Sequence, residues 1–210
     1  MKITKTVLSI ILCGCLLTGC GDSEKINMTE EDFPYGVTMT LNKLDFSAPV
    51  QYDERFLSAD LVKSVCDYYV SFQTKDVGLY KSVQTEDYLN YCLDEVYSGS
   101  YTADDVVVGS YDNMVEYVGE DYIVSLIDIT EATNDMTESN CSDILDMLDS
   151  ISTEKDGSKV SENITQIFEL TLDMYVSSAS EGKTGYTSLK PVEDNICYAY
   201  ELDGAWYLVV

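Results

Sequence analysis

One segment, residues 164–176, alternates apolar and polar side chains over a length that only a β-strand explains. Its apolar positions share one parity, which Gln166 interrupts, and they are Ile164, Phe168, Leu170, Leu172, Met174 and Val176. The polar positions between them are Thr165, Glu169, Thr171 and Asp173. A period of two puts the two sets on opposite faces, which predicts a half-buried strand in an antiparallel sheet.

The end of the chain predicts a second part of the same sheet. Residues 196–202 and 205–210 are strand-like runs separated by Asp203-Gly204, a dipeptide typical of a type I′ hairpin turn. Such a hairpin would place Tyr200 opposite Tyr207, Glu201 opposite Trp206 and Tyr198 opposite Val209. Residues 122–130 are apolar on both faces and predict a buried strand.

Helical spacing dominates the first half of the chain. Ser58 is a suitable N-cap for a helix with Leu61, Val65, Tyr68, Tyr69 and Phe72 on one face. Asp76 and Thr85 begin two further helices, the second with Tyr88, Leu89, Cys92, Leu93 and Val96 directed inward. Residues 104–118 predict either a fourth helix or a strand, because Gly109 and three consecutive valines weaken the helical pattern. Residues 142–151 predict a later helix, with Asp143, Asp146 and Asp149 on its solvated face. Helices followed by strands predict an α+β domain with N-terminal helices packed on one antiparallel sheet and a C-terminal β-hairpin.

The first twenty residues have the pattern of a secretory signal. Lys2 and Lys5 precede an apolar run, residues 7–17. As a helix that run would be about 16 Å long, too short for a hydrocarbon core of about 30 Å. It ends in Leu17-Thr18-Gly19-Cys20, which resembles the lipobox of bacterial lipoproteins. This resemblance implies cleavage before Cys20 and diacylation of its sulfur, and two acyl chains suffice for stable anchoring. The predicted organisation is a lipoprotein signal peptide (1–19), an acidic tether (20–50) and a globular domain (51–210).

Two further resemblances involve the domain and the segment before it. The helix 61–72 with the Gln73-Thr74-Lys75-Asp76 linker and the closing Asp203-Gly204-Ala205-Trp206 hairpin resemble the nuclear transport factor 2-like superfamily. That resemblance implies a curved, cone-like sheet. Pro34-Tyr35-Gly36 and Tyr52-Asp53-Glu54-Arg55-Phe56 are similar to motifs in lipoproteins of gut clostridia. Two alternatives exist for Phe33-Pro34-Tyr35-Gly36: it is part of a solvated tether, or it docks on the domain.

Charge and composition limit the chemistry. The chain has 12 Lys and Arg against 38 Asp and Glu, and loss of the two signal lysines changes its formal net charge from −26 to −28. Such a charge repels nucleic acids and anionic surfaces. The sequence contains no histidine, which excludes His-based triads and His-ligated metal sites. We predict a location at the cell membrane, lipid-anchored on the extracytoplasmic face of a Gram-positive envelope.

Cysteines and acidic clusters do not predict a cofactor. Beyond the signal and Cys20, four cysteines remain (Cys66, Cys92, Cys141 and Cys197), and the sequence does not determine whether they form disulfides or core thiols. No CxxC spacing occurs, and no acidic segment matches a calcium loop. We therefore expect no metal site and no cofactor.

The 17 tyrosines, against 5 Phe and 1 Trp, are the main functional signal of the domain. Tyrosine combines a rigid apolar ring with a polar tip, which suits a pocket wall, although the same residues also fit a half-buried sheet. If a cone-shaped pocket exists, its predicted lining is Tyr69, Phe72, Tyr88, Tyr200 and Trp206. The preferred hypothesis is a non-catalytic lipoprotein that binds a ligand or an envelope protein. The alternatives are an isomerase or lyase that uses Asp and Tyr in the pocket, or a structural or assembly lipoprotein.

Overall fold

The computed structural model describes residues 33–43, 45–134, 139–178 and 189–210, and the predicted signal peptide and Cys20 lie outside these ranges. The elements in chain order are β1 (Thr40–Asn42), β2 (Val50–Tyr52), α1 (Ala59–Thr74), α2 (Val77–Ser82), α3 (Glu86–Tyr91), the π-helical turn η2 (Cys92–Val96), α4 (Ala103–Val118), β3 (Tyr122–Thr133), α5 (Ser139–Asp156), the 3-10 turn η3 (Val160–Asn163), β4 (Ile164–Ser178), β5 (Lys190–Leu202) and β6 (Ala205–Val209). The α+β class predicted from the sequence is confirmed.

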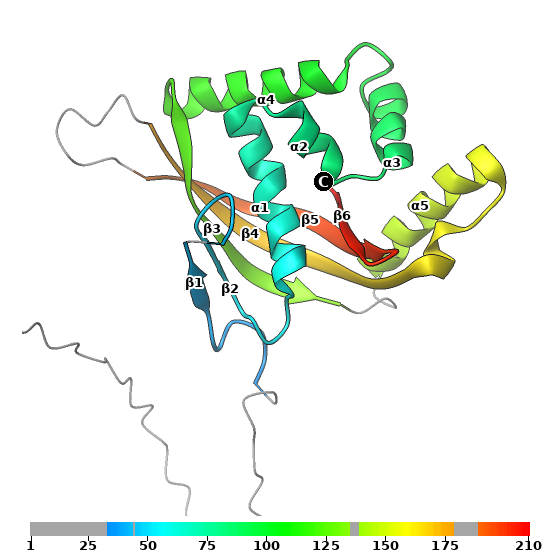
Figure 1. The fold of residues 1–210 in the computed structure, drawn as a ribbon, viewed down its shortest axis with the longest axis horizontal. Helices are drawn as coiled ribbons and strands as arrows, with labels where there is room; N and C mark the ends of the chain where they lie inside the picture. The colour runs from blue at the N-terminus through cyan, green and yellow to red at the C-terminus, as the bar shows by residue number, and fades with distance from the viewer. Residues whose placement is uncertain (1–32, 44, 135–138, 179–188) are drawn as a thin grey trace, which may run out of the picture.

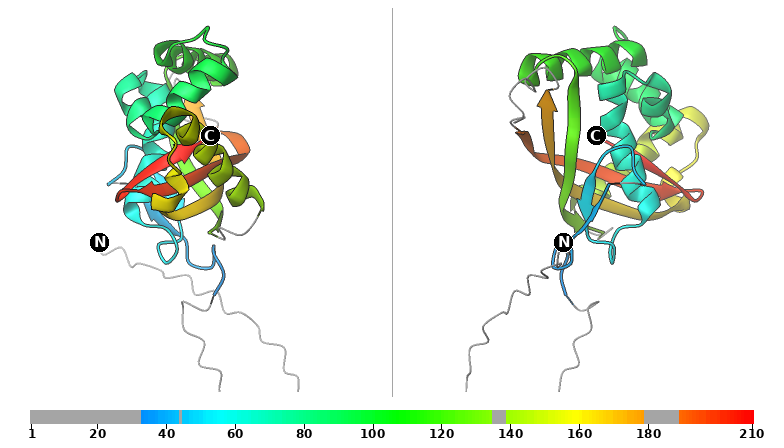
Figure 2. Two further views of the ribbon diagram at one scale, coloured as in Figure 1. Left: turned by 90° about the vertical axis from the view of Figure 1, so that its right-hand side faces the viewer. Right: turned by 60° about the vertical axis from the view of Figure 1, so that its left-hand side comes forward.

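Within the described residues the strands form one open sheet in the order β1-β2-β3-β4-β5-β6. Long, twisted strands β3, β4 and β5 make up most of it (Figure 2). Neighbouring strands are antiparallel except β2 and β3, which are parallel. The prediction of a purely antiparallel sheet is corrected at this one pair. Helices α1 to α4 connect β2 to β3, and such a long crossover returns the chain in the parallel direction.

The C-terminal hairpin has the predicted register. Tyr200 pairs with Tyr207, Glu201 with Trp206 and Tyr198 with Val209. Asp203 and Gly204 have φ values of 54° and 78°. Positive φ at both central residues is the requirement of the type I′ turn, which explains why Asp-Gly occurs here.

Capping determines where two of the long helices begin. The Ser58 side chain accepts a hydrogen bond from the N–H of Leu61 and caps α1. Thr102 and Asp105 form a reciprocal capping box at the start of α4. Of the two alternatives for residues 104–118, the helix is therefore correct, since the capping box satisfies backbone donors in its first turn. One inward assignment is wrong: Val96 is 62% exposed, because the wider turn of η2 places it toward solvent.

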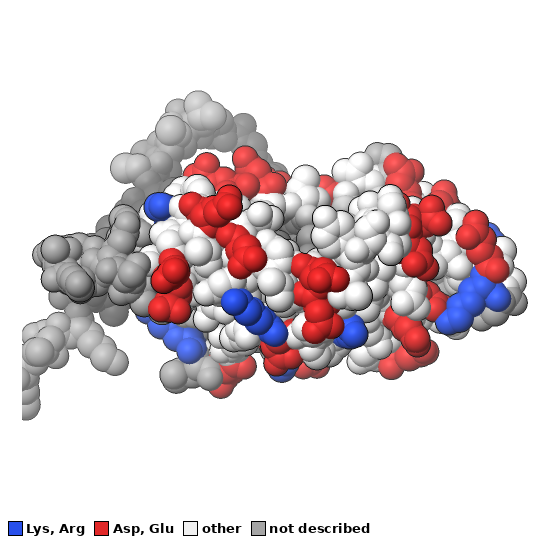
Figure 3. Space-filling view, turned by 90° about the horizontal axis from the view of Figure 1, so that it is seen from above, with Lys and Arg blue, Asp and Glu red and all other residues white. Residues whose placement is uncertain are grey.

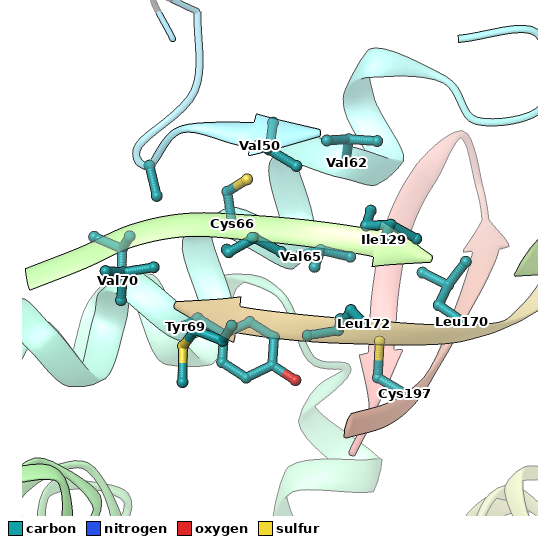
Figure 4. Close-up of a cluster of buried hydrophobic side chains, with 14 of the residues drawn as sticks. Val50, Val62, Val65, Cys66, Tyr69, Val70, Ile129, Leu170, Leu172 and Cys197 are labelled. Atoms are coloured by element: carbon teal, nitrogen blue, oxygen red, sulfur yellow. The ribbon is translucent and has the colours of Figure 1, made fainter. Parts of the chain in front are cut away.

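The two faces of the sheet carry separate hydrophobic cores. Helices α1, α2 and α4 lie on one side, and α5 lies beside the β5–β6 hairpin (Figure 1). The larger core packs one face of α1 onto β3 and β4, with Val65, Ile129 and Leu172 fully buried (Figure 4). The smaller core joins α5 to Ile167 and Tyr200. Both faces of β4 are therefore covered near its N-terminal end, where Ile167 and Phe168 are both buried.

Residues 33–36 contact the domain, so the structure has the docked alternative for Phe33-Pro34-Tyr35-Gly36. The Tyr35 hydroxyl donates to the carbonyl of Ile129 on β3 at 2.9 Å. After this contact, β1 pairs with β2. Residues 33–50 thus include ordered parts of the domain's edge, which the polar composition of the predicted 20–50 tether did not indicate. The strands β1 and β2 were missed because three residues are too few for a detectable alternation.

Candidate functional site

The five residues predicted to line one pocket are divided among three places. Tyr69 and Phe72 line a hollow between α1, α4 and the sheet. Tyr88 and Tyr200 line a smaller hollow of about 70 Å³ beside α5. Trp206 is buried in the larger core, where its ring lies 5.9 Å from that of Phe168. Four of the five residues are buried and Phe72 is half-buried, but the five do not line a single pocket.

The hollow next to Tyr69 is the candidate site, and we call it the inner pocket. Its volume is about 240 Å³. It is lined by Tyr69, Phe72, Ser110, Asn113, Met114, Tyr122, Val124, Met174, Val192 and Asn195. Most of these residues were not predicted. The available signal was that Met114 lies on the apolar stripe of residues 104–118 and Met174 on the apolar face of 164–176.

Two interruptions of the strand pairing shape the inner pocket. The first lies on β3 between Val124 and Leu126, and the second lies on β5 between Val192 and Asn195, which pair with Met174 and Leu172 of β4. A bulge bends its strand and leaves backbone groups without ladder partners. The Gln73 side chain at the end of α1 accepts the N–H of Val124 at 2.8 Å, which satisfies one such group. This contact ties β3 to the end of α1 beside the pocket.

The Asn195 side chain forms hydrogen bonds at the second interruption. Its amide donates to the carbonyls of Val192 at 2.7 Å and of Leu172 at 3.4 Å. Both amide hydrogens are therefore used by the backbone, and the amide oxygen of Asn195 is left as an acceptor. No described residue donates a hydrogen bond to this oxygen. A ligand donor could occupy that position.

Two phenol groups add polar atoms to an otherwise apolar wall. Burial raises the pKa of Tyr69 and of Tyr122 well above the ordinary value, so both remain protonated at neutral pH. Within the described chain neither hydroxyl has a hydrogen-bond partner, and neither oxygen is completely sealed from solvent. The Tyr122 ring lies 5.5 Å from Tyr111, whose other neighbour is the Lys75 ammonium at 3.7 Å. The contact with Tyr111 packs Tyr122 of β3 against α4.

No carboxylate or cationic side chain is among the described residues that line the inner pocket. The half-buried Asp128 carboxyl has a raised pKa, because of its burial and because of the nearby Asp173. However, Asp128 alternates along β3 with the core residues Ile127 and Ile129 and so lies on the opposite face. Among the described residues, the carboxyl group with a raised pKa is therefore away from the pocket.

The tyrosines beside α5 have structural partners. The Tyr200 hydroxyl lies 2.9 Å from the Thr85 hydroxyl, and the Tyr88 hydroxyl donates to the carbonyl of Val210 at 3.2 Å. Both hydroxyl groups link the start of α3 to the C-terminal hairpin. Because these polar groups are already satisfied, the small hollow beside them offers little for ligand recognition.

The four cysteines of the domain are core thiols. No disulfide joins Cys66, Cys92, Cys141 and Cys197, all of which lie in the described part of the chain. Burial raises the pKa of Cys66 and of Cys197 to about 12, so both thiols stay protonated and are poor nucleophiles. Their role is that of small apolar side chains.

Acidic groups are spread over the surface. Figure 3 shows them scattered over the face that carries α4, with few basic groups between them. Among the described residues no cluster of three or more Cys, Asp or Glu has a geometry that could hold a metal ion. Asp149 differs from the prediction of a solvated side chain, because it is buried and accepts hydrogen bonds from the Ser161 N–H and hydroxyl. It fixes the turn η3 to α5.

Two motifs noted in the sequence meet at one corner of the domain. The Arg55 guanidinium donates to the carbonyls of Phe33 and Pro34, and also to the carboxylate of Asp53. The Gly36 N–H donates to Asp53 at 3.1 Å. The Tyr35 ring packs at 5.6 Å from Phe56. We call residues 33–36 and 53–56 together the corner clasp.

Comparisons with known proteins identified no relative of this chain. No protein-family model matches the chain, and neither a curated protein nor a solved structure matches it. The site is therefore interpreted from its own geometry.

Proposed function

We propose that this protein is a lipid-anchored, extracytoplasmic binding protein that holds a small uncharged ligand in the inner pocket. The observation that carries the proposal is the composition of that pocket. Five of its ten lining residues are apolar, and among the polar ones the Tyr69 and Tyr122 hydroxyls and the Asn195 amide oxygen lack hydrogen-bond partners within the described chain. Unpaired polar groups in an apolar recess favour a ligand that can pair with them.

The size of the inner pocket limits the ligand. A dry cavity of about 150 Å³ accommodates benzene, and the inner pocket measures about 240 Å³. One or two fused rings therefore fit, whereas a drug-sized molecule does not. The absence of charge among the described lining residues favours a neutral ligand, because a buried unpaired ion is costly.

Binding is better supported than catalysis. An isomerase or lyase mechanism needs a base close to the substrate. The described lining supplies only protonated phenols, amides, a hydroxyl and apolar groups. The carboxyl group with the raised pKa, Asp128, lies on the other face of β3.

The anchor is the second part of the proposal and is supported by the sequence Leu17-Thr18-Gly19-Cys20. Within the described ranges, no helix has the length and apolar character needed to cross a bilayer. Diacylated Cys20 would hold the domain at the outer surface of the membrane. We also propose a relationship to the nuclear transport factor 2-like superfamily, on the sequence resemblance of the helix 61–72 and of the Asp203-Gly204-Ala205-Trp206 hairpin.

Indole is a suitable probe for the inner pocket. In protein carrying ¹³C-methyl methionine, we expect indole to shift the methyl signals of Met114 and Met174, which line the pocket. Met147 on α5 contacts the smaller core and serves as the internal control. Indole-3-acetate, which is negatively charged, should produce smaller shifts at the same concentration.

Blocking the pocket completes this test. Ser110→Trp places a large ring at the lining, and Ser150→Trp on α5 is the matched control at an exposed site. The first substitution should abolish the indole shifts, and the second should leave them unchanged. Absence of any shift at saturating indole in the folded wild-type protein would refute the ligand proposal.

Membrane fractionation of Cys20→Ala tests the anchor. We expect the variant to leave the membrane fraction, while Cys15→Ala, a change within the predicted signal, stays in it. Retention of Cys20→Ala at the wild-type level would show that the anchor assignment is wrong.

A further inference from the structure

The corner clasp determines where the chain leaves the domain. Asp53 is completely buried and binds Arg55, the Gly36 N–H and the Thr38 hydroxyl. Arg55 in turn holds the carbonyls of Phe33 and Pro34. Because these contacts link residue 33 to the start of α1, the segment toward Cys20 begins at this corner.

Four exposed apolar side chains belong to the corner clasp or to the segment that follows its first part. Phe33, Val37, Leu41 and Phe56 have exposed fractions of 37%, 53%, 47% and 39%. Phe33 and Phe56 are joined through Arg55, which donates to the Phe33 carbonyl and lies 5.0 Å from the centre of the Phe56 ring. Val37 follows Gly36, which is bound to Asp53. We call these four residues the corner patch.

The chain between the anchor and the corner patch is short. Residues 21–32 separate Cys20 from Phe33. At no more than about 3.5 Å per residue, this segment can span at most about 40 Å. The 20–50 tether predicted from the sequence would have allowed about 100 Å. A domain held this closely is repeatedly brought to the bilayer surface, with the corner as its nearest part.

Charge at the corner does not oppose contact with a neutral lipid surface. Arg55 is paired with the buried Asp53, and the exposed Lys43, Asp45 and Glu54 leave one net negative charge. Glu30-Glu31-Asp32 immediately precede Phe33 in the sequence, so the surface that the corner meets must be neutral and not anionic. Apolar side chains beside mixed charges are suited to the interface of zwitterionic lipid.

We propose that the corner patch, Phe33, Val37, Leu41 and Phe56, inserts into the bilayer surface to which Cys20 anchors the protein. The inference rests on the proposed lipid anchor. It goes further, because it gives the domain a fixed orientation with the corner patch on the membrane and α4 directed away from it. In Figure 1, α4 lies at the opposite end of the domain from residues 33–36.

Fluorescence in reconstituted vesicles tests the contact. The acylated full-length mature protein carrying Val37→Trp is placed in phosphatidylcholine vesicles with brominated acyl chains. Val37 has a 53% exposed side chain in the connection between the corner clasp and β1, so the change should not disturb folding. Val108→Trp on α4, at a site 43% exposed, is the matched control. The native Trp206 is buried and contributes equally to both.

We expect several-fold stronger quenching of the added tryptophan at position 37 than at position 108. Equal, weak quenching in protein that sediments with the vesicles would overturn the corner patch while leaving the anchor intact, and it would assign these side chains to a protein partner. Failure to detect a diacylated Cys20 by mass spectrometry would instead remove the anchor, and with it this inference. Thermal unfolding of both variants confirms that they are folded.

Discussion

Asp53 and Asp128 are two carboxyl groups removed from water on either side of Tyr35, yet their surroundings differ in kind. Asp53 is fully buried and accepts hydrogen bonds from Arg55, Gly36 and Thr38. Asp128 is half-buried, and its Oδ1 atom is sealed from solvent without a hydrogen-bond partner in the described structure. The Tyr35 hydroxyl bridges the two regions, since it binds the Ile129 carbonyl and accepts the Asp53 N–H at 3.4 Å.

The difference shows in their pKa values. Hydrogen bonds from the Arg55 side chain lower the pKa of Asp53 from 3.8 to about 2. Burial, with the charge of Asp173 on the neighbouring strand, raises the pKa of Asp128. Burial by itself therefore does not determine the charge of a carboxyl group, and the number of donors around it does. Asp53 stabilises the fold in its ionised form, whereas ionised Asp128 destabilises it.

The largest expected effect follows from Asp53→Ala. The variant removes the acceptor for Arg55, Gly36 and Thr38, and takes away the carboxylate that balances the charge of a partly buried guanidinium. We expect a loss of about 2–3 kcal/mol in the free energy of unfolding, measured in urea. Glu54→Ala, at the exposed neighbouring position, should change it by less than about 0.5 kcal/mol. Similar losses in both variants would contradict the role given to Asp53.

Acid should abolish the stability difference between the wild type and Asp53→Ala. Because the pKa of Asp53 is lower in the folded protein than in the unfolded chain, its stabilisation is complete above pH 4 and disappears as the pH falls to about 2. Urea unfolding of the wild type and Asp53→Ala over this range should therefore converge. A constant gap down to pH 2 would mean that packing, and not the ionised carboxylate, provides the stability.

Tyr35→Phe tests the bridge between the two regions. Loss of the hydroxyl leaves the Ile129 carbonyl and the Asp53 N–H without this partner. We expect a decrease of about 1 kcal/mol in the free energy of unfolding, together with faster amide exchange at residues 33–42. Tyr101→Phe, at a site 54% exposed, is the control and should be neutral. Unchanged exchange in Tyr35→Phe would separate the corner clasp from β3.

The smallest expected effect has the opposite sign. Asp128→Asn removes a charge that faces Asp173 and should raise the free energy of unfolding by about 0.5 kcal/mol at pH 7. The pKa of Asp128 is raised in the folded protein, so ionisation costs stability as the pH increases through and above its ordinary value. The gain should therefore shrink toward pH 3. Glu131→Gln, exposed on the same strand, should have no comparable effect, and a loss of stability in Asp128→Asn would contradict the comparison.

Local features of the chain were predictable because their causes are local. Asp203-Gly204 determined the turn and hence the pairing of Tyr200 with Tyr207. Ser58 and Asp76 capped helices where the sequence placed them. The alternation of residues 164–176 predicted β4. Residues 104–118 remained ambiguous because their valines favour a strand, and the capping box of Thr102 and Asp105 together with packing against α1 selected the helix.

The inner pocket and the corner clasp depend on contacts between distant parts of the chain. Tyr69 and Tyr88 share a residue type and helical spacing, but α1 places one beside the inner pocket and α3 places the other beside the C-terminal hairpin. The motifs at residues 34–36 and 52–56 were recognisable in the sequence, but only as separate segments. Only the fold brings Arg55 to the carbonyls of Phe33 and Pro34.

The sequence by itself determined the helices other than α4, the long strands, the C-terminal hairpin and the absence of histidine chemistry, and it predicted an anchor at Cys20. Periodicity, caps and turns determine these features over a few residues. The tertiary structure decided the parallel pairing of β2 with β3, the division of the aromatic residues among separate hollows, and the opposite pKa shifts of Asp53 and Asp128. Each of these depends on which distant groups meet, and that is set by the path of the whole chain.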